Sequence, residues 1–202
     1  MIVPNYVPEP LEVPANVTQE PYARRLRFIR AVAARHALLV CAIAGLAVSP
    51  LMGRVIALFP LPLSVAILAG LFIVLDLWRI ARRGHRIEAA LTAGSAPLIV
   101  LALALVAREL EEVGIPISSA LFGGLAAGFY LALCGRDLSF LGMGLSALAL
   151  SSAALLVWGT TPLGLAINAA VLCYWVYDLA SLLSRRRIGE EWAAAVGWTP
   201  AP

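Results

Sequence analysis

A single carboxylate within an apolar stretch, Asp178, is the residue of this sequence best placed to do chemistry. Tyr174 and Tyr177 lie just before it, and three consecutive arginines, at 185–187, follow the end of the stretch. A carboxylate inside a segment long enough to cross a bilayer is energetically costly, and residues of this kind commonly belong to ion or proton pathways. Asp178 and the two tyrosines are therefore a candidate ion or proton switch.

His36 is the second titratable candidate. It lies one turn into the first apolar segment, and an imidazole changes its charge near neutral pH. Two interpretations stay open for each residue. Asp178 is either an ion-handling group or a structural carboxylate that is hydrogen-bonded to Tyr174, a serine, an arginine or His36. His36 is either a proton carrier or an interfacial residue with one good hydrogen bond.

No pattern typical of an enzyme accompanies these residues. The sequence lacks a Gly-rich phosphate loop after a strand, a His-Glu-x-x-His helix and a Ser/His/Asp set. It has only two histidines, and Cys41, Cys134 and Cys173 lie far apart in apolar segments without the spacing of metal ligands. We therefore expect no catalytic activity, no metal and no cofactor.

The composition predicts a membrane protein. Of the 202 residues, 61% are hydrophobic and 13% are charged, and the mean hydropathy is +0.90. Soluble domains carry about 25% charged residues, so this chain has too few to cover a globular surface. All 15 basic residues are arginines, and they gather at the ends of apolar segments. That distribution is typical of topology determinants, so the expected partner is the lipid bilayer and not a nucleic acid.

Six apolar segments approach the length of about 20 residues that a helix needs to cross a bilayer. They are expected at about 31–50, 60–80, 91–107, 117–134, 139–158 and 162–183. Pro162 suits the first turn of the last helix. The fourth segment contains small residues that let helices approach closely, namely Gly123, Gly124 and Gly128. The sequence therefore predicts an all-α integral membrane protein, a six-transmembrane-helix bundle with the fourth helix at its centre.

The arginines predict how the bundle is oriented. Six spans place both termini on one side of the membrane. Only two arginines, Arg54 and Arg108, fall on the opposite side. The other arginines fall on the side of the termini, namely Arg24, Arg25, Arg27, Arg30, Arg35, Arg79, Arg82, Arg83, Arg86, Arg136, Arg185, Arg186 and Arg187. By the positive-inside rule both termini are cytoplasmic. The exclusive use of arginine as the basic residue, with much Ala and Gly, indicates a bacterium with a GC-rich genome. We therefore expect the protein to lie in the bacterial inner membrane.

Three domains are expected. Residues 1–22 form a Pro-rich N-terminal tail, because five prolines within them disfavour a helix. Residues 23–188 form the six-helix transmembrane domain. Residues 189–202 form a short C-terminal tail.

Three short motifs resemble the Bax-inhibitor family, also called transmembrane Bax inhibitor motif proteins. The clearest is RDLSFLG at 136–142, which resembles the start of the family's fifth helix and contributes Arg136, Asp137, Ser139, Phe140 and Gly142. The second, YWVYDL at 174–179, is similar to the Tyr-Asp motif of the sixth helix. The third, RRLRFIRAVAARHALLV at 24–40, is similar to the Phe-Ile-Arg lead into the first helix.

The resemblance implies a pair of carboxylates that share a proton and gate a pH-sensitive calcium leak. Asp178 matches the first carboxylate of that pair. The second belongs to a half-buried final helix, for which we expect no counterpart after residue 188. Glu190 and Glu191 are possible replacements, although pairing with the nearby arginines or exposure to water is the alternative.

The sequence departs from the family because it lacks a counterpart of the second carboxylate and its helix, and two functions are considered. The first is a non-catalytic accessory subunit or regulator of a membrane protein complex, whose Pro-rich ends lie along a partner membrane protein. The second is a pH-sensitive leak channel for Ca²⁺ or H⁺ that is gated through Asp178.

Overall fold

The computed structural model describes residues 13–58, 85–134 and 140–198, with isolated residues between 63 and 74. Its elements are a 3-10 helix η2 (Val17–Gln19) and the helices α1 (Tyr22–Ala47), α2 (Pro50–Leu58), α4 (His85–Gly94), α5 (Ala96–Glu112), α6 (Ile117–Cys134), α7 (Phe140–Trp158), α8 (Pro162–Arg185) and α9 (Glu191–Trp198). The described part of the chain contains no strand. The prediction of an all-α protein is confirmed.

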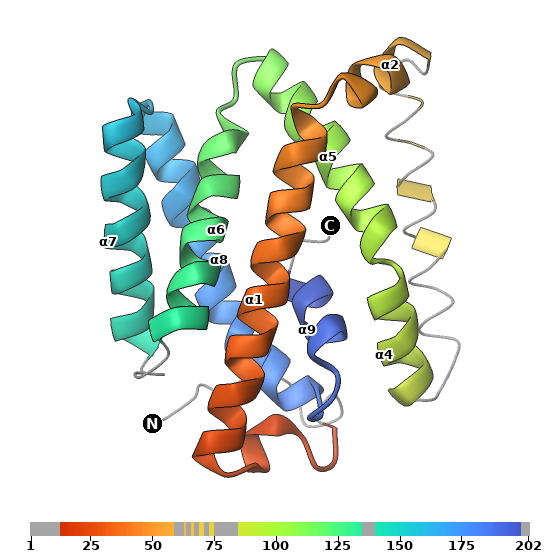
Figure 1. Cartoon of the computed structure of the whole chain (residues 1–202), viewed down its shortest axis with the longest axis vertical. Helices are drawn as coiled ribbons and strands as arrows, with labels where there is room; N and C mark the ends of the chain where they lie inside the picture. Colours follow the sequence, from red (N-terminus) through yellow and green to blue (C-terminus); the bar gives the residue numbers. More distant parts are fainter. Residues whose placement is uncertain are drawn as a thin grey trace.

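The long helices run side by side, and α6 lies among them (Figure 1). It contacts α1, α5, α7 and α8. Gly123 of α6 is so close to α8 that an added methyl group would overlap the side-chain oxygen of Asn168. Gly128 lies against Ala33 and Ala37 of α1. The small residues of α6 thus sit where neighbouring helices approach most closely, in a central position.

The last three long helices have nearly the boundaries expected from the sequence. Helix α6 coincides with the segment 117–134, α7 begins one residue later than expected and α8 ends two residues later. Pro162 begins α8, and the hydroxyl of Thr161 accepts a hydrogen bond from the Gly164 N–H at 3.2 Å. Apolar composition and local capping signals together determined these boundaries.

The expectation of one straight helix at 91–107 was wrong. The chain forms α4 and α5 there, with a bend of 43° between them at Ser95. Pro97 lies in the first turn of α5, where it lacks the N–H that would continue the hydrogen-bond ladder of α4. Gly94 and Ser95 precede the break and lower the preference for a continuous helix.

The first helix begins earlier than the apolar segment at 31–50. Helix α1 starts at Tyr22, directly after Pro21, so the basic stretch is part of the helix. The apolar segments around Cys41 and Cys173 predict buried thiols, but both residues are exposed on helix surfaces. The segment at 60–80 lies mostly outside the described residues.

One described helix, α1, is long and apolar enough to cross a membrane, and α4 with α5 would be a second if the bent pair is one span. Shorter apolar helical stretches occupy Ile117–Leu133, Leu145–Trp158 and Pro162–Tyr174. The six-span bundle therefore stays a prediction.

The expectation that residues 189–202 form only a tail was wrong. Residues Glu191–Trp198 form α9, which lies inside the bundle (Figure 1). Its residues at 193–196 are at most 1% exposed. Three alanines and a valine are small enough to fit between longer helices, and their short run was not recognised in the sequence as a helix.

Candidate functional site

The buried helix α9 defines the first candidate site. It contacts α1, α4 and α8, three helices that are far apart in the sequence. The α9 side chains that fill the space between these helices are small and apolar, and His36 of α1 is 1% exposed beside them. The backbone at Ala195 is a hydrogen-bond partner of His36. His36 is therefore not an interfacial residue, as one interpretation of the sequence had it, but part of the core that holds α9.

A charged contact fixes the start of α9 to α1. The Arg35 guanidinium lies 3.8 Å from the Glu191 carboxylate and 5.4 Å from the centre of the Trp192 ring. An ion pair and a cation–π contact thus act on the same side chain. Glu191 also accepts a hydrogen bond from the Gly189 N–H at 3.2 Å, which stabilises the turn before the helix.

A second charged contact joins α4 to the end of α8. Arg186 donates two hydrogen bonds to the two oxygens of Glu88, at 2.6 and 3.1 Å. The Thr92 hydroxyl donates to the same carboxylate at 2.9 Å. The Arg186 side chain is 10% exposed and that of Glu88 is 30% exposed. This bidentate geometry is among the stronger kinds of ion pair and ties the two helices together next to α9.

The segment before α1 is bound to this same end of the bundle. The N–H groups of Val13 and Val17 donate to the carbonyls of Ser184 and Arg186, at 3.2 and 2.9 Å. The Arg187 side chain donates to the Pro14 carbonyl at 3.0 Å. The described part of the tail, 13–21, is therefore docked on its own chain and is not an extended arm.

Glu190 and Glu191 both have partners near the triple arginine. Glu190 accepts a hydrogen bond from the Arg187 N–H at 3.0 Å, and Glu191 pairs with Arg35. The donor to Glu190 is the backbone of Arg187 and not its guanidinium, and Arg35 belongs to α1 and not to the triple arginine, so neither contact is the expected ion pair with the triple arginine. Neither contact involves Asp178.

The structure places only some of the predicted switch residues. Asp178 and Tyr177 belong to α8, but their side chains lie outside the described set. The Tyr174 ring is 44% exposed, in contrast with buried His36. Arg136, Asp137 and Ser139 also lie outside the described residues. Phe140 and Gly142 belong to the start of α7, where the structure describes only the backbone.

Polar contacts between α6, α7 and α8 were not recognised in the sequence. Asn168 of α8 is fully buried and donates to the Ser151 hydroxyl of α7 at 2.9 Å. The hydroxyls of Ser119 and Thr160 lie 2.9 Å apart. An asparagine in an apolar helix was the available signal, because such a residue requires a polar partner on a neighbouring helix.

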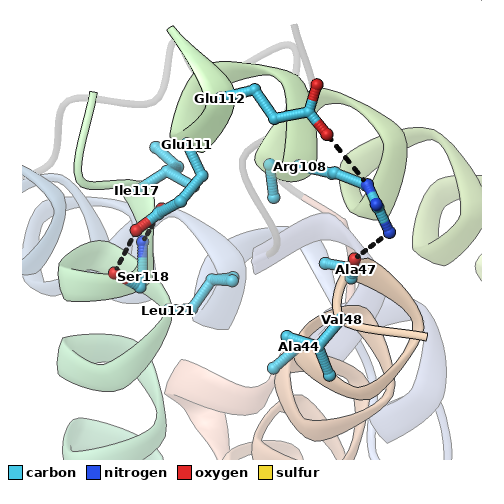
Figure 2. Close-up of a pocket in the computed structure, with 10 residues that line it drawn as sticks. Ala44, Ala47, Val48, Arg108, Glu111, Glu112, Ile117, Ser118 and Leu121 are labelled. Carbon is cyan, nitrogen blue, oxygen red and sulfur yellow. Dashed lines mark hydrogen bonds and ion pairs between the residues drawn. The ribbon is translucent and has the colours of Figure 1, made fainter. Parts of the chain in front are cut away.

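The opposite end of the bundle contains a cavity of about 450 Å³ between α1, α5 and α6. Arg108 and Glu112 of α5 lie at its edge, 3.1 Å apart, and Arg108 also donates to the Ala47 carbonyl at the end of α1 at 3.4 Å (Figure 2). Glu111 accepts hydrogen bonds from the Ser118 N–H and hydroxyl at 3.0 and 2.9 Å.

Neither end has a group of His, Cys, Asp and Glu side chains that could hold a metal ion, within the part of the chain that the structure describes. The arrangement offers instead a tightly packed, ion-paired end around α9 and a hollow end next to Arg108. No protein-family model, curated protein or solved structure matches this chain.

Proposed function

We propose that this chain is a multi-pass protein of the bacterial inner membrane with a Bax-inhibitor-like, six-span fold and cytoplasmic termini. The arrangement of helix ends supports this topology. Arg186, after α8, contacts Glu88 in the first turn of α4 and Val17 just before α1. Arg108 is at the other end, bonded to the end of α1. The basic residues are thus separated as the positive-inside rule requires.

Within that topology the role is non-catalytic, as an accessory subunit or regulator of a membrane protein complex. The observation that carries this proposal is the closure of the bundle by α9. Among the described residues, the cavity at the Arg108 end adjoins a smaller apolar cavity that His36 also lines, and α9 fills the space between α1, α4 and α8. An ion would lose its hydration in such an apolar cavity without gaining polar ligands. Binding to other membrane proteins is therefore favoured over conduction.

Helix α7 offers an exposed apolar surface to a partner. Its main contacts are with α6 and α8, so most of its circumference faces outward. Large apolar side chains cover that face, namely Leu145, Leu150, Leu156, Val157 and Trp158. We place the partner on this face, because the described part of the N-terminal tail is already occupied by its own bundle.

The test is native mass determination of the tagged protein after extraction in a mild detergent. We expect a stoichiometric second protein to remain bound. Ala153→Trp, at an exposed position of α7, should release that partner, since a bulky ring would separate the two helix surfaces. Ala42→Trp, at an exposed position of α1, is the matched control and should retain it. A chain that stays alone under all conditions would refute the accessory role.

The leak channel is a second candidate, because the presence of α9 removes one reason against it. The lack of a final helix was a reason against this function, and α9 is a short, buried helix after the sixth apolar segment. If the leak interpretation is correct, Asp178→Asn shifts the pH dependence of Ca²⁺ flux into liposomes. Flux that is unchanged in this variant, or absent from the unaltered protein, would exclude the channel.

A further inference from the structure

Two cavities adjoin each other along α1. The outer cavity has a volume of about 450 Å³, and the inner one a volume of about 140 Å³. They share three lining residues, Ala107, Ile117 and Leu121. The inner cavity is lined by apolar side chains except for His36 at its end. The combined space lies between α1, α5 and α6, and the outer cavity falls within the size range of small-molecule sites.

The length of this space matches a lipid chain. Val48 lines the outer cavity and His36 lines the inner one, so the two cavities extend over twelve residues of α1. At the rise of an α-helix this is about 18 Å. Half of the hydrocarbon core of a bilayer is about 15 Å thick. One alkyl chain of ordinary lipid length would therefore reach from the mouth to His36.

The charges at the mouth favour a cationic head group. Two carboxylates, those of Glu111 and Glu112, and a single guanidinium, that of Arg108, line the outer cavity, and Figure 2 shows Glu112 directed toward Arg108 and Glu111 toward Ser118. Arg108 is already paired with Glu112 and with backbone carbonyls, and its bond to the Ser49 carbonyl is 3.2 Å long. Helices α1 and α5 end here with partial negative charge, whereas α6 begins here with partial positive charge, so the helix ends partly offset one another. The side chains that line the mouth carry two negative charges and one positive charge.

We propose that these two cavities bind a single-chain amphiphile with a cationic head group. The head lies between Glu111 and Glu112, and the alkyl chain extends past Leu121 towards His36. This site is distinct from the α7 face proposed for a partner protein, and its occupancy does not depend on that partner.

The experiment measures binding of alkyltrimethylammonium ions of increasing chain length to the full-length protein in nanodiscs, with empty nanodiscs subtracted. We expect saturable binding of one molecule per chain. The affinity should rise about fourfold per methylene, at about 0.8 kcal/mol each, until the chain fills the space, and then level off. Partition into lipid alone would give an unsaturable signal that keeps rising with chain length, and this result would overturn the proposal.

Ala120→Leu tests the position of the chain. Ala120 lines the inner cavity and is 7% exposed, so three added carbons would shorten the space available to the ligand. The affinity should then level off at a shorter chain length. Ala42→Leu makes the same change on an exposed face of α1 and should leave the chain-length profile unaltered. Equal profiles for the two variants would overturn the assignment.

Glu111→Gln tests the head group. Its amide oxygen can still accept a hydrogen bond from Ser118, while the negative charge is removed. The unaltered protein should prefer alkyltrimethylammonium over the alkanoate of equal chain length by about fivefold, because an exposed charge contributes up to about 1 kcal/mol. The variant should lose most of that preference. A site that takes the alkanoate equally well before the substitution would refute the cationic head group.

Discussion

The two ends of this helix bundle are built in opposite ways from similar residues. At the end that holds α9, alanines at 193–195 are fully buried and the arginine Arg186 is bound by a carboxylate on another helix. At the other end, Ala107 and Ala120 border open cavities, and Arg108 is paired with Glu112 of its own helix. The same residue types therefore produce a closed end and a hollow one.

The difference comes from what the chain supplies after α8. Helix α9 is an additional element that fills the space between α1, α4 and α8. Among the described elements, the short helix at the opposite end is α2, which contacts α1 and α5. A bundle of long helices leaves gaps where helices diverge, and an inserted short helix is one way to fill them.

The largest expected effect follows from one substitution made at both ends. Ala194→Leu should lower the free energy of unfolding by about 2 kcal/mol, because Ala194 is 0% exposed and added carbons would force neighbouring side chains out of their rotamers. Ala120→Leu should be neutral or stabilise by up to about 1 kcal/mol, because its new carbons enter a cavity. Thermal unfolding of the two variants in one detergent measures the difference. Equal destabilisation would mean that the ends do not differ in packing.

The hydrophobic pattern of the sequence predicted the hollow end better than the packed one. Boundaries at Ile117 and Trp158 follow directly from where apolar runs begin and stop. Long apolar helices differ so strongly from their polar connections that composition alone locates them. Helix α9 has only eight residues and begins with Glu191, so no such contrast marks it. Its helical state depends on burial against distant helices, which a local pattern does not report.

The partners within the candidate site were also beyond a local analysis. Glu88 and Arg186 are 98 positions apart, and their pairing requires α4 and α8 to meet at one level. The triple arginine predicted a cytoplasmic helix end but not which of its members would be buried. Pro97, by contrast, is a local signal that correctly indicates the bend before α5, and the expected straight helix overlooked it.

A smaller effect is expected at the charged contact of the packed end. Arg186→Met should lower the free energy of unfolding by about 2 kcal/mol or less, because Glu88 would lose its bidentate partner. Removing one partner of a fully buried ion pair costs about 3–5 kcal/mol. The cost is smaller here because Glu88 is partly exposed. Combining it with Glu88→Gln in a double-mutant cycle separates the pair from the packing of the arginine stem. A coupling energy near zero would show that the contact only fills space.

The smallest effect is expected for Arg108→Met, the matching substitution at the hollow end. The side chains of Arg108 and Glu112 are 30% and 56% exposed, and pairs of that kind contribute about 0–1 kcal/mol because water and salt screen them. The bonds to the carbonyls of Ala47 and Ser49 would be replaced by bonds to water. We therefore expect a change below about 1 kcal/mol, measured beside Arg186→Met at the same salt concentration. If Arg108→Met destabilised the protein as much as Arg186→Met, the end of α1 would depend on Arg108. The contacts of the two arginines would then contribute equally to the free energy of unfolding.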